Sequence, residues 1–365
     1  GEDPFLGSAF AVARVRGFQG DARADVRDAS RMLATAKHFA AYGAAESGRD
    51  YNIADVSQRT LYEVYLPPFR AAAEAGVGSM MTAFNEIAGV PMHAHAELVR
   101  DTLRKAWGWN GVVVSDYTGI KEMLVHGVAK DRTQAGELAM RATIDVDMIS
   151  YIYLKEMVQS VKSGAIPVAL VDAAVRRVLR AKQQLGLFDD PYRYSDPQRE
   201  AVRTLTKESR ALAREAAAQS IVLLKNSEAG LLPLRKDAGT IAVVGALAVD
   251  TRATLGSWNG LGQPTDAISV LDGIRKAVGD KARISYARGA AATSSDRSGF
   301  EEAERVARAA DVVLAVVGEI EDMSGEARSR TGLALPGAQQ ALLERLVKTG
   351  KPIVAVLMNG RPLAL

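Results

Sequence analysis

Short apolar runs alternate with longer amphipathic stretches through the first 190 residues of the chain. The apolar runs predict buried strands at 34–39, 79–84, 111–116 and 144–149. Apolar residues at helical spacing predict helices over 57–75, 97–107, 134–143, 154–163 and 168–187. The pair Pro67 and Pro68 is expected to kink or split the first helix, because proline cannot donate the helical hydrogen bond. This alternation indicates an α/β fold with a parallel sheet.

A second block with the same alternation follows a polar stretch. We predict an inter-domain linker and helix over 191–219, since 196–206 carries few core residues and 207–219 is typical of a long helix. Strands are then predicted at 221–224, 240–244, 283–287, 311–317 and 352–358. Helices are predicted at 270–278, 299–310 and 337–349. A chain of 365 residues is long enough for two or three domains, and the pattern divides it into 1–190 and 220–365.

The first block contains four clear strand–helix units. A closed (β/α)8 barrel needs eight such units and about 250 residues. The first block is therefore expected to be either a smaller open sheet or half of a barrel.

Composition narrows the classes of function. The net charge is only +3, from 46 basic and 43 acidic residues, so nothing favours a nucleic-acid or anionic-membrane partner. There is no cysteine, which excludes disulfides and thiolate chemistry, and no apolar run approaches the roughly 20 residues of a membrane span. No signal peptide is recognised, and because no Met precedes Gly1 the chain is expected to be processed, tagged or truncated. Four scattered histidines disfavour a metal centre, although a pair at His93 and His95 stays open.

Polar side chains stand where the predicted strands of the first block end. The pairs are Lys37–His38, Phe84–Asn85, Ser115–Asp116 and Asp147–Met148. If the strands are parallel, these groups converge on one face, where charge-assisted hydrogen bonds suit a polyhydroxylated ligand. Each also has an ordinary structural interpretation: Asp116 and Asp147 as helix caps, Lys37 as a surface lysine and His38 as a core histidine.

An acidic loop follows the strand predicted at 311–317. It holds Glu319, Glu321, Asp322 and Glu326, with two arginines close behind. Such a loop could reach a neighbouring domain. By composition alone, a solvated charged loop is the simpler interpretation.

Several motifs in this order resemble glycoside hydrolase family 3, and more narrowly its bacterial β-glucosidases. In the first block they are Lys37-His38-Phe39-Ala40-Ala41-Tyr42-Gly43, Arg49-Asp50-Tyr51-Asn52 and Ser115-Asp116-Tyr117. In the second block they are Ser220 to Asn226, Gly256-Ser257-Trp258, Gly318-Glu319 through Leu333-Ala334-Leu335-Pro336-Gly337, and Val356 to Leu363. The resemblance covers essentially the whole chain.

The resemblance implies a fold and an activity. The fold is the C-terminal part of a (β/α)8 barrel followed by an α/β sandwich with a mostly parallel sheet, with the active site between the two domains. The activity is a retaining, exo-acting β-glucosidase that removes terminal non-reducing β-D-glucosyl residues through a covalent intermediate. No cofactor or metal is needed. A β-xylosidase or a broad-specificity β-glycosidase of the same family is the alternative.

The resemblance also implies residue roles. Asp116 takes the place of the nucleophile, and Glu326 that of the general acid/base, with Glu319 as second choice. Lys37 and His38 take positions that bind sugar hydroxyls.

Five further residues are expected at the substrate. Arg49 and Asp50 would lie near the pocket mouth, Phe84 and Tyr117 beside the nucleophile, and Trp258 beyond the cleaved bond. Phe84 and Tyr117 are departures, because many members have Tyr and Trp there. The run after His38 lacks the His of the family branch that cleaves N-acetylglucosaminides, which argues against that branch.

Two expectations concern the rest of the protein. The family's early barrel strands, which bind the glycone, are absent upstream of the Gly1-Glu2-Asp3-Pro4 segment, and the second domain is expected to be incomplete at its C-terminus. Missing barrel segments, or a complementing chain, are therefore expected as partners, and a homodimer is left open. The resemblance alone implies a periplasmic or secreted location in a bacterium.

Alternatives from other classes remain at this stage. Lys37 at a strand end would suit a Schiff-base aldolase. A dehydrogenase is weaker, since the Gly-x-Gly-x-x-Gly motif is missing after the strand at 240–244. The third alternative is a non-catalytic sugar-binding fragment.

Overall fold

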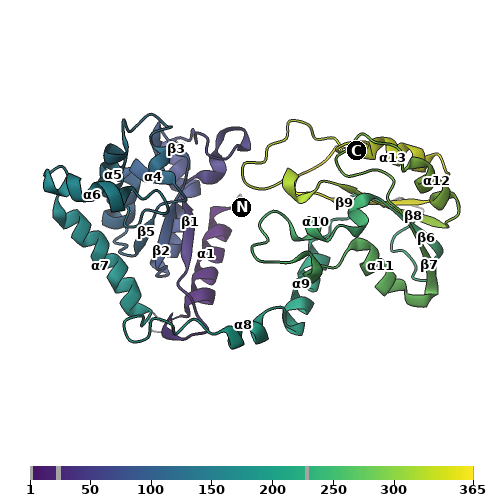
Figure 1. Ribbon diagram of the computed structural model, residues 1–365, viewed down its shortest axis with the longest axis horizontal. Helices are drawn as coiled ribbons and strands as arrows, with labels where there is room; N and C mark the ends of the chain where they lie inside the picture. Colours follow the sequence, from purple (N-terminus) through teal and green to yellow (C-terminus); the bar gives the residue numbers. More distant parts are fainter. Residues whose placement is uncertain (1–2, 22–25, 227–229, 365) are drawn as a thin grey trace. The chain divides into compact units, whose positions relative to one another are not determined.

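The computed structural model describes residues 3–21, 26–226 and 230–364. The chain divides into two compact units, Gly1–Ser209 (unit 1) and Arg210–Leu365 (unit 2) (Figure 1). No helix in these described ranges is both long and apolar enough to cross a membrane.

Unit 1 is built on a parallel sheet in the order β1-β2-β5. Its strands are β1 (Thr35–Phe39), β2 (Ser79–Thr82) and β5 (Val112–Val114), and a small antiparallel hairpin pairs β3 (Glu86–Ile87) with β4 (Val90–Pro91). Its helical segments are α1 (Pro4–Gln19), η2 (Tyr42–Ala44), η3 (Glu46–Gly48), α2 (Gln58–Thr60), η4 (Leu61–Tyr65), α3 (Pro67–Glu74), η5 (Met92–Ala94), η6 (Glu97–Ala106), α4 (Gly119–Glu122), α5 (Arg132–Arg141), α6 (Ile152–Lys162), α7 (Val168–Gln184) and α8 (Pro197–Arg203).

Helices flank this sheet on both sides. In Figure 1, α1 lies beside β1, while α7 lies on the other side, beyond β5. Phe39, Met80 and Leu103 are among the core side chains that are almost fully buried. The β1–β2 register shifts between Ala36 and Phe39.

The predicted break in the first helix is confirmed. A π-helical turn, η4, ends at Tyr65, and α3 begins anew at Pro67. Proline is well suited to the first helical position, because its missing N–H would have no partner there.

Two predicted elements of unit 1 differ from the structure. The run 144–149 forms only one bridge, between Val146 and Val114, although the Val146 and Met148 carbonyls still accept N–H groups from the segment after β5. Within this run, Asp145 turns its carboxylate to two arginines. The polar segment 196–206 holds a helix, α8, whose start is capped by Asp196.

Unit 2 contains a parallel sheet in the order β7-β6-β8-β9. The strands are β6 (Gly239–Val244), β7 (Ala282–Ala287), β8 (Val312–Gly318) and β9 (Ile353–Met358). The helical segments are η7 (Ala246–Val249), α10 (Thr251–Leu255), η8 (Pro264–Asp266), α11 (Val270–Val278), η9 (Gly279–Lys281), α12 (Phe300–Arg308), η10 (Glu321–Met323) and α13 (Gln339–Val347). The division between the units falls inside the helix α9 (Lys207–Ser220).

Alternate residues of the unit 2 strands pack against opposite helical layers. Val244 and Val313 share a core cluster with Phe300 of α12, whereas Val243 and Leu314 share another with Leu271 of α11. The sheet is therefore buried on both faces, which explains why its strands are nearly continuous apolar runs. Both units confirm the predicted α/β class with mostly parallel sheets.

The predicted strand at 221–224 is absent. Its four side chains are exposed by 64–79%, and this stretch has no ladder partner among the described residues. An apolar run forms a strand only where a neighbouring backbone accepts its hydrogen bonds, and sequence periodicity does not report the neighbour.

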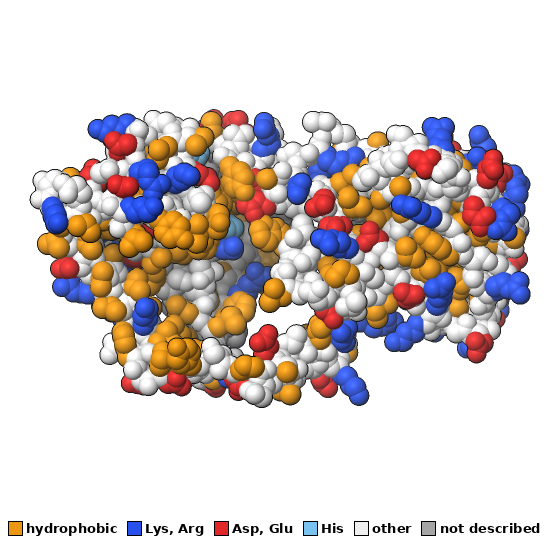
Figure 2. Space-filling model, viewed as in Figure 1, with side chains coloured by type: hydrophobic (Ala, Val, Ile, Leu, Met, Phe, Trp, Pro, Cys, Tyr) orange, Lys and Arg blue, Asp and Glu red, His pale blue; other side chains and the backbone are white. Residues whose placement is uncertain are grey.

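The surfaces of the two units differ in character. In Figure 2, hydrophobic side chains gather on the visible face of unit 1, whereas acidic and basic side chains alternate with hydrophobic ones over unit 2. The alternation agrees with ion pairs such as Glu302–Arg305 and Glu304–Arg308 on α12.

Candidate active site

Asp116 lies where β5 ends, and its side chain is only 10% exposed. Its Oδ1 accepts the Tyr117 N–H at 2.7 Å, and its Oδ2 is 3.3 Å from His38 Nε2. Its own carbonyl accepts the Gly119 N–H at 3.1 Å, where α4 begins. The carboxylate thus turns one oxygen to the backbone and the other to a side chain from β1.

His38 connects this carboxylate to an aromatic wall, formed by Tyr42, Tyr51 and Phe84. The His38 and Tyr42 rings meet edge to face with centroids 5.2 Å apart. Phe84 lies 6.2 Å from the Tyr42 ring and 4.8 Å from the Tyr51 ring. Because Phe84 itself is only 6% exposed, it mainly supports the other two rings.

His93 contacts the backbone of Asp116. Its Nε2 accepts the Asp116 backbone N–H at 3.1 Å. Burial lowers the pKa of His93 to about 3, with a smaller contribution from His126. His95 accepts the Leu98 N–H through Nδ1. Each ring therefore uses a nitrogen to accept a backbone N–H, and no group of three potential ligands gathers anywhere in residues 3–21, 26–226 and 230–364.

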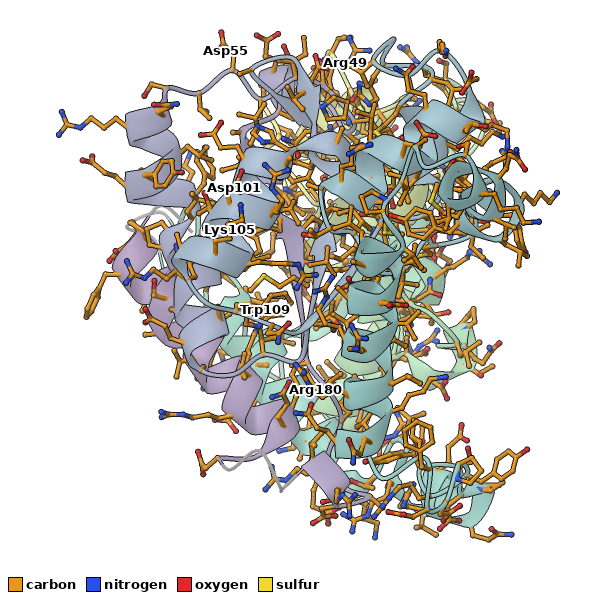
Figure 3. All side chains as sticks on the ribbon, turned by 90° about the vertical axis from the view of Figure 1, so that its left-hand side faces the viewer. Arg49, Asp55, Asp101, Lys105, Trp109 and Arg180 are labelled. Carbon is orange, nitrogen blue, oxygen red and sulfur yellow. The ribbon has the colours of Figure 1, made fainter. Side chains whose placement is uncertain are left out.

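Four other expected residues lie at or near the end of the sheet where Asp116 stands. Lys37 is exposed on β1, and Tyr117 is 58% exposed beside Asp116. Arg49 is exposed and Asp50 half-buried on the loop after η3. Figure 3 places Arg49 at the opposite end of unit 1 from Arg180. Arg180 helps to line a cavity of about 310 Å³ at the other ends of the strands.

Two strand-end polar residues have structural roles. Asp147 accepts the N–H groups of Ile152 and Tyr153 at 2.7 and 3.1 Å, so it caps α6. Asn85 is fully buried and donates to the Ala40 carbonyl at 3.3 Å, tying β2 to the end of β1. The cap interpretation therefore holds for Asp147.

A buried ion triad of Asp145, Arg104 and Arg177 contacts β5. Asp145 has no exposed side-chain surface, and its oxygens lie 2.7 Å from Arg104 and 2.7 Å from Arg177. It also accepts the Val113 N–H at 2.9 Å, within the strand that leads to Asp116. Burial lowers the pKa of Arg104 to about 10, while Asp145 acts in the opposite direction.

In unit 2, Glu319 and Glu326 have different surroundings. Glu319 is 1% exposed at its side chain, forms an ion pair with Arg330, and lies 3.4 Å from Arg361. Glu326 is half-buried on the same loop.

Trp258 lies close to the Glu326 loop. It is 76% exposed. A Cβ placed on Gly325, the residue before Glu326, would be 3.9 Å from its indole nitrogen. The structure thus groups two of the predicted unit 2 residues.

Family models match both units of the chain. The Glycosyl hydrolase family 3 N terminal domain matches residues 1–181, and the C-terminal domain of the same family matches residues 221–365. The chain belongs to glycoside hydrolase family 3.

Individual family 3 relatives show how far the likeness extends. The chain is 42% identical to a periplasmic β-glucosidase of Salmonella typhimurium, covering 100% of this chain and 50% of that protein. It is 38% identical to a β-xylosidase of Formosa agariphila, covering 100% and 52%. A crystal structure of β-glucosidase from Listeria innocua with glucose matches with a TM-score of 0.91 and 40% identity, covering 100% and 49%. The chain therefore spans about half the length of these relatives.

Three residues near the family 3 candidate nucleophile were not predicted as site residues from the sequence. Tyr42 and Tyr51 were seen only as parts of motifs, and the aromatic wall becomes visible only in three dimensions. His93 was considered only as a metal ligand. A lone histidine 23 residues before Asp116 gives no periodic signal that could have revealed its contact.

Proposed function

We propose that this protein is a retaining, exo-acting β-glucosidase that hydrolyses terminal non-reducing β-D-glucosyl residues. The observation that carries the proposal is the buried Asp116 carboxylate at a strand end, with His38 Nε2 at 3.3 Å from Oδ2. A cap would need only the backbone contact through Oδ1. The similarity to β-glucosidases from two bacteria supports the choice of glycone.

Asp116 acts as the nucleophile. Its Oδ2 attacks the anomeric carbon, the bond to the leaving oxygen breaks, and a glycosyl-enzyme ester forms. Glu326 gives its proton to the leaving oxygen and then takes one from the water that cleaves the ester. The sugar leaves with its original anomeric configuration, because two displacements occur.

Glu326 is preferred to Glu319 for proton transfer. The Glu319 carboxylate is buried against Arg330 and Arg361, an arrangement that favours a structural role. The half-buried Glu326 stands on a loop beside Trp258, whose exposed indole would stack on the sugar beyond the cleaved bond.

The remaining predicted residues bind substrate. Lys37 and His38 bind hydroxyls of the first sugar, while Arg49 and Asp50 act at the pocket mouth. Phe84 and Tyr117 complete the set: Phe84 backs the aromatic wall, and the exposed ring of Tyr117 offers an apolar face. β-Linked glucosides or oligosaccharides are the substrates, and the protein is periplasmic or secreted, a location supported by the similarity to the periplasmic β-glucosidase of Salmonella typhimurium.

A β-xylosidase activity is the second candidate, favoured by the 38% identity to the Formosa protein. The two sugars differ by one hydroxymethyl group. Initial rates with matched aryl β-glucoside and β-xyloside, measured on the whole natural protein, separate the two assignments.

The nucleophile assignment is tested with Asp116→Gly. Hydrolysis of an aryl β-glucoside should fall by roughly 10⁴-fold or more, and added azide should restore release of the aryl group by forming the α-glycosyl azide. Asp131→Asn, which alters the cap of α5, is the matched control. Near-normal hydrolysis in Asp116→Gly would refute the assignment. Binding of glucose without turnover in the parent protein would favour a sugar-binding role instead.

A further inference from the structure

The backbone of Asp116 has an unusual partner for a strand end. Its N–H donates to the imidazole of His93 at 3.1 Å, rather than to a carbonyl of a neighbouring strand. His93 lies on η5 and is 1% exposed. The position of Asp116 therefore depends on a side chain from a different segment of unit 1.

Gly119 makes this approach possible. A Cβ at position 119 would overlap both Cε1 and Nε2 of His93. Gly119 begins α4 and donates its own N–H to the Asp116 carbonyl. The missing side chain thus leaves room for the ring on the turn that carries the carboxylate.

His93 must be neutral to accept this hydrogen bond, since an imidazolium has no free lone pair. Burial is the main cause that lowers the pKa of His93, and His126 adds to that effect. His126 Nδ1 in turn lies 3.5 Å from Glu86. The imidazole is therefore a fixed acceptor and not a proton carrier under ordinary conditions.

We propose that His93 is a positioning residue for Asp116, which fixes the backbone of the nucleophile so that Oδ2 faces the substrate while Oδ1 is held by the Tyr117 N–H. The inference rests on the proposed function, in which Asp116 attacks the sugar. His93 itself touches no reacting atom. Its effect is orientation, and a displacement of about 1 Å in a reacting group can cost on the order of 10²-fold in rate.

The experiment compares His93→Leu with His93→Gln in the whole natural protein. Leu fills the site without an acceptor, whereas the Gln carbonyl oxygen can occupy a place close to that of Nε2. We expect kcat for an aryl β-glucoside to fall about 10- to 100-fold in His93→Leu and to recover most of that loss in His93→Gln. Inhibition by glucose should change less than about threefold, because the binding groups remain in place.

Gly119→Ala perturbs the same contact from the other side. It should lower kcat in the same direction, since the added methyl group displaces the ring. Gly17→Ala is its control, because nothing lies within 4 Å of the added carbon there. If His93→Leu does not fold, the comparison of His93→Gln with Gly119→Ala decides the question.

Failure of the inference about His93 and failure of the proposed function can be distinguished. If a 2-deoxy-2-fluoroglucoside labels Asp116 in the parent protein but His93→Leu and Gly119→Ala keep kcat within twofold, the role of His93 is refuted and the proposed function stands. If the parent protein neither turns over glycosides nor is labelled at Asp116, the proposed function fails. An equal fall in His93→Leu and His93→Gln would also overturn the inference, because it would show that the acceptor is irrelevant.

Discussion

The buried triad beneath β5 offers a sharp stability test. Asp145→Ala removes the carboxylate that two guanidinium groups share, and the side chains of Arg104 and Arg177 are only 9% and 12% exposed. It also leaves the Val113 N–H without its carboxylate acceptor. Breaking a buried ion pair by removing one partner costs about 3–5 kcal/mol, because the remaining charge stays buried and unpaired. We expect the free energy of unfolding of unit 1 to fall by that amount.

Tryptophan fluorescence during urea unfolding is a suitable assay. Two of the three tryptophans, Trp107 and Trp109, lie in unit 1, and the Arg104 guanidinium is 5.6 Å from the Trp109 ring centre. Trp258 of unit 2 is largely exposed, so its signal should change little. The fluorescence change on unfolding therefore reports mainly on unit 1, the region that the substitution disturbs.

Asp172→Ala on α7 is the matched control. Asp172 lies 3.8 Å from Arg176 in a pair whose side chains are more than half exposed. Such surface pairs contribute about 0–1 kcal/mol. If Asp145→Ala cost no more than this control, the triad would not support β5 and the reasoning would be refuted.

Three further predictions each concern one residue. The pKa of His93 falls from 6.5 to about 3 on folding, so its contribution to stability is fully present above pH 6.5 and is lost on acidification. The loss is roughly 2 kcal/mol by pH 5. Urea unfolding at pH 5 and 7.5 should show this loss in the parent protein and a smaller one in His93→Gln. Gln19→Ala should lower the free energy of unfolding of unit 1 by about 1–3 kcal/mol, because the Gln19 amide bridges two backbone N–H groups and one carbonyl where β1 and β2 begin. The same fluorescence assay measures this loss, and an unchanged free energy would contradict the prediction. Gly245→Ala should destabilise unit 2 by at least about 1–3 kcal/mol, because the φ of Gly245 is 127° and the new Cβ would overlap the Val316 carbonyl. The loss should be seen as faster amide exchange in β6 and β8. Gly273→Ala, where no atom lies within 4 Å of the added Cβ, should leave the exchange unchanged.

Much of the architecture was predictable because it depends on local patterns. Continuous apolar runs identified β6 and β8, which are buried on both faces, and the Pro67 pair located a helix break. The helix α1 was overlooked, although Asp3 before Pro4 is a start signal that the structure uses as a cap. The run at 221–224 failed for the opposite reason: its pattern suits a strand, but no neighbouring strand pairs with it in the described chain.

The candidate site was predictable only in part. The ends of parallel strands meet, so His38 and Asp116 could be expected together from sequence order alone. The contacts of His93 could not, since they depend on how the β3–β4 hairpin directs the chain from β2 to η5. Asp147 and Asp116 have the same sequence signal at a strand end, and only the structure shows that Asp147 caps a helix.

The ion pairs of Glu319 impose an order on events during synthesis. The acidic loop leaves the ribosome before β9 and before Arg361, which lies 3.4 Å from Glu319 in the folded unit. β6, β7 and β8 can pair as soon as they emerge, yet a buried Glu319 lacks one of its two cations until Arg361 has been translated. The loop that carries Glu326 is therefore expected to acquire its final form among the last parts of unit 2, and a nascent chain stalled before Arg361 should remain sensitive to protease at this loop.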